Sequence, residues 1–161
     1  MTQDAMNPSY YRFEGIQPID LIEEYCKSLH GVYAFDTGNI IKYASRWPYK
    51  NGLQDLKKCA WYARHLRDTV ERDYANGYKG ILGIMRLSNS DVLRIGKKVE
   101  QITSNLHDIE YVYTSKILML AFTWRVTSRD TSDLTELVRA VEHLIGYFDP
   151  DYIHNNEKGC K

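Results

Sequence analysis

The residues of this chain that are best suited to chemistry fall into two polar stripes, each with the spacing of one helix face. The first stripe stands at i, i+3, i+4 and i+7 and consists of Asn39, Lys42, Tyr43 and Arg46. The second stands at i, i+3 and i+7 and consists of Asp55, Lys58 and Tyr62. A tight loop with Lys50 and Gly52 separates them, so an antiparallel helix pair could face both stripes into one cleft.

Such a cleft would suit a phosphate-bearing ligand. Its cations would be Lys42, Arg46, Lys50 and Lys58, with Asp55 to orient one of them. A helix that starts at Gly38-Asn39 would add free N–H groups, and all three kinds of donor bind phosphate. Tyr43, Tyr62 or Trp61 could stack on a base. A stripe of this kind is also typical of a solvated helix face, so spacing alone leaves both interpretations open.

Helices would have to position both stripes. Pro18 suits the first turn of a helix, and Pro48 must end a second one that Asp36 or Thr37 would cap. Apolar periodicity and these signals predict helices over residues 18–29, 38–47, 53–74, 88–106, 109–126 and 132–148. No stretch alternates at period two for long enough to suggest a sheet. The sequence therefore predicts a compact all-α domain of about six helices.

The clearest break in the chain is the segment Asn76 to Gly80. It separates a first half, residues 1–75, which carries both polar stripes, from a second half, residues 81–150. Residues 81–87 fit a strand or a helix equally well. Residues 151–161 form a polar tail.

The two halves show a faint repeat. At an offset of 77 residues, and of 78 after one extra residue in the second loop, identical residues pair as Thr37/Thr114, Trp47/Trp124, Asp55/Asp133 and His65/His143. Amphipathic helices also match by chance, because their apolar positions share one period. The paired Trp and His favour a duplication in which two three-helix halves pack about a pseudo-twofold axis. Because Lys42 becomes Met119 and Arg46 becomes Thr123, the second half would be scaffold.

Composition narrows the function classes. The 21 basic and 21 acidic residues balance, which argues against a general nucleic-acid-binding surface. Three cysteines without a CxxC spacing favour reduced thiols in a cytosol over disulfides or a zinc site, and the histidines lack a metal-binding spacing. No segment approaches the roughly 20 apolar residues that span a membrane.

Several short motifs together resemble one small phage-encoded family, which includes the nucleotide kinase of T-seven-type podophages. The similar segments are Asn7-Pro8-Ser9-Tyr10-Tyr11, Ile19-Asp20-Leu21-Ile22-Glu23, Gly38-Asn39-Ile40-Ile41-Lys42-Tyr43 with Arg46, Lys50-Asn51-Gly52, and Asp55-Leu56-Lys57-Lys58 with Trp61-Tyr62. The resemblance runs from Asn7 to about Leu66. Two departures stand out, because the family usually has His at the position of Tyr10 and Arg-Ala-Gly-Lys-Lys where this chain has Arg46-Trp47-Pro48-Tyr49-Lys50.

The resemblance implies a viral protein in a bacterial host cytoplasm that transfers a phosphoryl group to a (deoxy)nucleoside monophosphate. The implied catalytic residues are Lys42, Arg46 and Lys58. The implied ligand-binding residues are Gly38, Asn39, Tyr43, Lys50, Asp55, Tyr62 and Tyr10. No metal site and no cofactor beyond the nucleotide itself is implied.

Two further function classes stay open. The same pocket without catalysis could capture a nucleotide or a nucleotide-derived signal, which would disarm a host defence. A protein inhibitor of a host enzyme, with no small ligand, also fits a neutral helical chain of this size, and so does a homo-oligomer. The sequence thus predicts nucleotide binding by the first half, with kinase activity slightly ahead of capture.

Overall fold

A computed structural model describes residues 13, 15–77, 87–127 and 131–152, with no side-chain description for residues 125–127. The described residues form the six helices α1 (Pro18–Cys26), α2 (Gly31–Arg46), α3 (Leu53–Ala75), α4 (Asn89–Thr103), α5 (Asp108–Thr127) and α6 (Ser132–Phe148), with a short 3-10 helix, η2 (Trp47–Tyr49), after α2. The predicted all-α fold is confirmed. Tyr10 and most of the segment 81–87 lie outside the described residues.

Local signals in the sequence set several helix ends as expected. Pro18 is the first residue of α1, and the Gln17 N–H donates to the Asp20 carboxylate at 2.9 Å. Pro48 ends α2 at Arg46, because a proline ring cannot continue the helix. The predicted bounds of the third and last helices agree with α3 and α6 to within about a residue.

The predicted start of the second helix is wrong. Helix α2 begins at Gly31, seven residues before Gly38, so Asp36 and Thr37 are buried helical residues and not caps. Gly38 instead allows α2 to pack closely on α1, because a Cβ there would lie 3.2 Å from the Ile22 side chain of α1. Its N–H group therefore belongs to the helix interior, and the expected anion site at a helix end does not form there.

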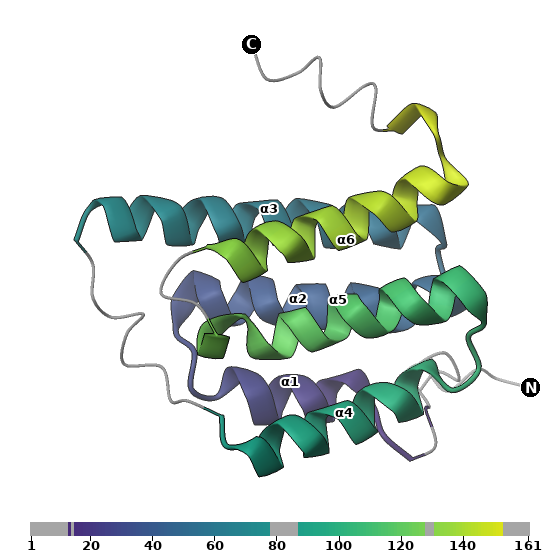
Figure 1. Cartoon of the computed structure of the whole chain (residues 1–161), viewed down its shortest axis with the longest axis horizontal. Coiled ribbons are helices and arrows are strands. Elements are labelled where there is room, and N and C mark those ends of the chain that lie inside the picture. The colour runs from purple at the N-terminus through teal and green to yellow at the C-terminus, as the bar shows by residue number, and fades with distance from the viewer. Residues whose placement is uncertain (1–12, 14, 78–86, 128–130, 153–161) are drawn as a thin grey trace, which may run out of the picture.

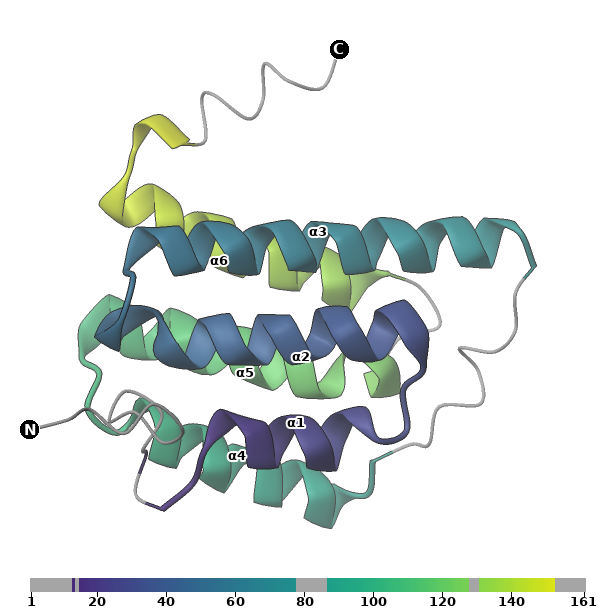
Figure 2. The same ribbon diagram turned by 180° about the vertical axis from the view of Figure 1, so that it is seen from behind.

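The helices form two facing layers of three. Figure 1 shows α4, α5 and α6 in front of α1, α2 and α3, with each layer stacked in the same order from bottom to top. Figure 2, turned by 180° about the vertical axis, shows nearly the same arrangement with the layers exchanged. The two halves of the chain are thus related by an approximate twofold axis.

Reciprocal hydrogen bonds mark this axis in the core. The Trp47 indole donates to Thr114 Oγ1 at 3.0 Å, and the Trp124 indole donates to Thr37 Oγ1 at 3.3 Å. The sequence offset equates the two tryptophans with each other and the two threonines with each other, and all four side chains are buried. Reciprocity of this kind is what a twofold axis requires, because each contact must have a counterpart with the partners exchanged.

The turn between the first two helices of each half, α1 to α2 and α4 to α5, also repeats. The Leu29 N–H donates to the Cys26 carbonyl at 2.9 Å, and at the equivalent positions the Leu106 N–H donates to the Thr103 carbonyl at 2.9 Å. The next helix then starts with a residue at positive φ in both halves, Gly31 at 55° in one and Asp108 at 48° in the other. The backbone therefore turns in the same way at both places, whichever residue is there.

A single core lies between the layers. Its fully buried large side chains come from both halves and include Leu56, Leu66, Ile117, Phe122 and Leu134. The apolar stripe of α3 from Leu56 to Val70 and that of α6 from Leu134 to Ile145 are buried as their periodicity predicts, whereas Phe148 at the end of α6 is 39% exposed. In helix α1, Leu21 and Tyr25 face the core while Ile19 is 51% exposed.

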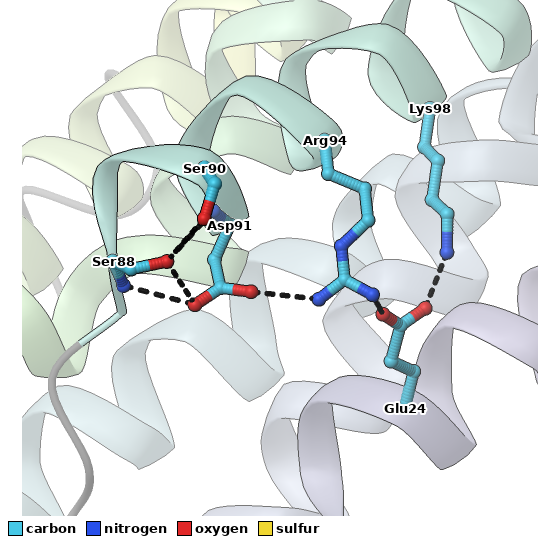
Figure 3. Close-up of polar contacts among 6 residues, drawn as sticks. All are labelled: Glu24, Ser88, Ser90, Asp91, Arg94 and Lys98. Carbon is cyan, nitrogen blue, oxygen red and sulfur yellow. Dashed lines mark hydrogen bonds and ion pairs between the residues drawn. The ribbon is translucent and has the colours of Figure 1, made fainter.

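Ion pairs and hydrogen bonds connect α1 to the start of α4 (Figure 3). Ser88 caps α4, since its Oγ accepts from the Asp91 N–H at 3.2 Å and its own N–H donates to Asp91 at 2.9 Å. Arg94 then joins Asp91 at 2.8 Å to Glu24 of α1 at 2.5 Å, and Lys98 binds the other oxygen of Glu24. This network positions the lower edge of the two layers.

Two further findings concern membrane-spanning helices and the cysteines. None of the helices in the described ranges is both long and apolar enough to cross a membrane. Cys26 and Cys59 are buried cysteines, and burial raises the pKa of the Cys59 thiol, so that thiol stays protonated.

Candidate functional site

The polar residues of α2 and α3 meet along the outer line where these two helices pack. We call this surface the α2–α3 seam; its residues are Phe35, Asn39, Lys42, Tyr43, Lys58, Trp61, Tyr62 and His65. Tyr43 lies at its centre, and three cations surround the ring of that residue. Lys42 Nζ lies 5.3 Å from the ring centroid, Lys58 Nζ 5.6 Å and Arg46 Cζ 4.7 Å. The two predicted stripes therefore do converge.

Arg46 reaches this cluster from the interior. Its guanidinium holds Asp55 with two hydrogen bonds, of 2.8 Å from Nε to Oδ2 and 3.1 Å from the second nitrogen to Oδ1. The side chains of Arg46 and Asp55 are 8% and 0% exposed. Asn51 donates a further bond of 3.2 Å to Asp55, and Lys58 Nζ lies 3.8 Å from the same carboxylate. Arg46 is therefore a buried residue and not the open cleft cation that the sequence predicted, and its pair with Asp55 fixes the α2–α3 turn from within.

Aromatic rings continue the seam along α3. Tyr43 stacks on Tyr62 with centroids 5.8 Å apart and planes at 16°. Tyr62 also contacts Phe35 at 5.8 Å and Trp61 at 4.9 Å, both edge to face. Phe35 and Trp61 are 61% and 55% exposed, unusually high for such large apolar side chains. Burial, and then the proximity of Tyr43 and Asp36, raise the pKa of Tyr62, so its hydroxyl stays neutral and can donate.

His65 and the buried carboxylate of Asp36 lie at the end of the row of aromatic rings. The His65 ring stacks on Trp61 with centroids 5.0 Å apart and planes at 11°. Its Nδ1 lies 2.7 Å from Asp36 Oδ2, while Asp36 Oδ1 is buried without a hydrogen-bond partner. Burial raises the pKa of Asp36, and the hydrogen bond and charge of His65 offset part of that rise. Sequence reasoning missed this pair, because residues so far apart along the chain share no helical spacing.

The remaining predicted residues that the structure describes are Gly38, Asn39 and Lys50, and they have contacts with residues other than Tyr43. Gly38 is buried against α1, and the Asn39 amide donates to the Phe35 carbonyl at 2.9 Å on the edge of the seam. Lys50 lies in the exposed turn between η2 and α3, where its N–H donates to the Arg46 carbonyl at 3.1 Å. Tyr10 is outside the described residues.

The matching face of the second half carries different chemistry. Lys42, Arg46 and Lys58 correspond to Met119, Thr123 and Glu136. Glu136 pairs with Lys116 at 2.5 Å, and Thr123 donates to the Met119 carbonyl at 2.8 Å. The three cations that surround Tyr43 therefore have no counterparts in the second half.

The seam combines ammonium groups, a row of aromatic rings and an imidazole, which suits a planar, anionic ligand. As for metals, no group of three or more His, Cys, Asp or Glu side chains within the described ranges could hold an ion.

Comparison with known families gives one match. A family described as a protein of unknown function, DUF3310, matches residues 5–64 and so covers α1, α2, the turn after them and the first half of α3. No curated protein and no solved structure matches the chain. The matched segment carries every residue of the seam except His65, and the family description assigns it no activity. The resemblance to a nucleotide kinase therefore stays a prediction.

Proposed function

We propose that the α2–α3 seam binds a nucleotide, with the phosphate at Lys42 and Lys58 and the base on the aromatic row. The observation that carries the proposal is the set of three cations around the Tyr43 ring, which is itself stacked on Tyr62. Among the described residues, Asp55 pairs with two of these charges and Asp36 lies beneath His65, so three cations and two carboxylates lie along this surface. The described residues thus give it a positive excess in a chain whose formal net charge is zero.

The three cations differ in how deeply they are buried, and so in whether they can contact a ligand. Lys58 is 42% exposed and Lys42 is half-buried, so both ammonium groups can reach a phosphate from solvent. Arg46 already gives two hydrogen bonds to Asp55, so we assign it to holding Tyr43 and the turn. This assignment changes the expectation from the sequence, in which Arg46 was one of four cations facing the phosphate.

The proposal is for binding, and phosphoryl transfer is not part of it. Transfer depends on several charges placed around the moving phosphoryl group. Of the three residues predicted for that task, Arg46 is engaged with Asp55 inside the protein. Capture of a nucleotide or nucleotide-derived signal in a phage-infected bacterium needs only the exposed lysines and the rings.

Calorimetric titration tests the proposal. The four deoxynucleoside monophosphates, ATP and cyclic dinucleotides are titrated into the wild-type chain, into Lys42→Ala and Lys58→Ala, and into Lys116→Ala as a surface-cation control from the second half. We expect each seam variant to lose roughly 10- to 150-fold in affinity, the value of a charged hydrogen bond. The control should bind like the wild type. Equal affinity for all four proteins would refute the proposal.

The exposure of Phe35 and Trp61 favours one alternative, which is an interface with a host protein. Aromatic residues of this kind are typical interface anchors. Under this alternative no nucleotide binds to the wild type in the same titrations. Phe35→Ala and Trp61→Ala would then abolish an interaction that Lys58→Ala leaves intact.

A further inference from the structure

We infer that His65, oriented by Asp36, is a ligand-contacting residue of the seam that accepts a hydrogen bond from the nucleoside part of the ligand through Nε2. The inference rests on the proposed nucleotide-binding function and adds to it the recognition of the nucleoside. Asp36 is in this account a positioning residue, because it acts only through His65.

The geometry fixes which nitrogen of His65 can accept. An ionised carboxylate is an acceptor only, so Nδ1 at 2.7 Å from Asp36 carries the proton. In the neutral ring Nε2 is then the acceptor. The side chain of His65 is 44% exposed, and within the described residues Nε2 has no hydrogen-bond partner. Stacking on Trp61 holds the ring plane in place, so the acceptor is fixed in direction.

The second half shows that the fold does not require Asp36. His143 occupies the position equivalent to His65, and it stacks on Tyr113, the equivalent of Asp36, with centroids 4.7 Å apart and planes at 8°. An aromatic ring therefore satisfies this position in one half. In the other half the chain keeps a fully buried carboxylate with one oxygen unpartnered, which costs stability. A function at His65 accounts for that cost.

Position along α3 tells which part of the ligand His65 contacts. It lies seven residues beyond Lys58, or about 10 Å along the helix axis at 1.5 Å per residue. With the phosphate at Lys42 and Lys58, His65 and Trp61 are at the far, nucleoside end. The donor is an N–H of the base or the hydroxyl of the sugar, since both offer the same chemistry to Nε2.

Nitrogen NMR of the histidine rings tests the orientation without any ligand. We expect the neutral form of His65 to show a protonated Nδ1 and an unprotonated Nε2. In Asp36→Asn the amide would donate to Nδ1, so the proton would move to Nε2, as occurs when an Asp–His pair loses its carboxylate. Wild-type His65 protonated at Nε2 would overturn the role assigned to Asp36, whatever the protein binds.

Calorimetry with the tightest-binding deoxynucleoside monophosphate tests the contact. His65→Ala should bind roughly 3- to 10-fold more weakly, the value of one neutral hydrogen bond. His65→Gln, which keeps an amide oxygen near the place of Nε2, should recover part of the loss. His143→Ala, the matched control, should bind like the wild type, and circular dichroism checks that each variant folds.

The outcomes separate this inference from the function on which it rests. If the wild type binds and His65→Ala binds equally well, the inference is wrong while nucleotide binding stands. If no deoxynucleotide binds to the wild type, both fail together. A 2′,3′-dideoxynucleotide identifies the donor: an unchanged effect of His65→Ala assigns it to the base, and a vanished effect assigns it to the sugar hydroxyl.

Discussion

The first and second halves of this chain share a backbone plan and differ in what they place on its surface. Both have three helices in the same order, the same tight turn before the middle helix and one half of a reciprocal Trp–Thr pair. Within the residues that the structure describes, only the first half surrounds a tyrosine with cations and buries a carboxylate beneath a histidine. The shared features are those that the fold needs, and the unshared ones are candidates for function.

The largest expected effect comes from the buried ion pair of Arg46 and Asp55, since the position equivalent to Arg46 in the second half is Thr123. Arg46→Ala leaves the Asp55 carboxylate buried without its partner, so we expect the free energy of unfolding to fall by about 3–5 kcal/mol. Thr123→Ala, at the equivalent position, removes one helical hydrogen bond and should cost less than about 1 kcal/mol. Urea denaturation followed by circular dichroism measures both.

Similar losses in the two variants would contradict the distinction between the halves. The double variant Arg46→Met with Asp55→Asn sharpens the test, because removing both charges leaves no buried ion without a partner. It should be more stable than Arg46→Ala alone.

The second-largest expected effect is the loss of stability when a Trp–Thr hydrogen bond is removed, and it should be equal in both halves. Thr37→Val and Thr114→Val keep the side-chain shape but leave the Trp124 and Trp47 indole N–H groups buried without acceptors. Each should lower the free energy of unfolding by about 1–3 kcal/mol. Chemical denaturation of the two variants checks the twofold relation, which a large loss in one and none in the other would break.

Substitutions at the two equivalent turn residues should change the free energy of unfolding by less, and in opposite directions. Gly31 has positive φ, so Gly31→Ala should cost about 1–2 kcal/mol through backbone strain. Asp108 adopts the same conformation with a side chain, so Asp108→Gly should be neutral or stabilising by up to about 1 kcal/mol. Thermal unfolding compares them, and a loss in Asp108→Gly would show that this side chain has another role.

The smallest expected effect is a dependence of stability on pH. Because burial raises the pKa of Asp36 above 3.8, this residue favours the folded state most at low pH, and its contribution is lost as the pH rises through the raised pKa. Asp36→Asn should remove that part of the pH dependence, while the changed bond to His65 limits any gain at pH 7. Urea midpoints at several pH values, wild type against variant, measure the difference; identical profiles would exclude a raised pKa.

Much of the fold and part of the seam could be predicted from the sequence. Prolines, caps and apolar periodicity act locally, so the ends of α3 and α6 and the convergence of Lys42 and Lys58 could be predicted. The start of α2 could not, because Gly38 resembles a helix breaker until its contact with Ile22 is known. The burial of Arg46 and the Asp36–His65 pair depend on contacts between helices, which no single-helix pattern contains.

The most direct test of the account uses the three tryptophans as reporters. Trp61 is exposed on the seam, whereas the indole N–H groups of Trp47 and Trp124 are buried in bonds between the halves. In a proton–nitrogen NMR titration with a deoxynucleoside monophosphate, we predict that the Trp61 indole signal moves and saturates while the other two stay in place. Signals of Trp47 and Trp124 that move while Trp61 stays fixed, or three that never move, would contradict nucleotide binding at the α2–α3 seam.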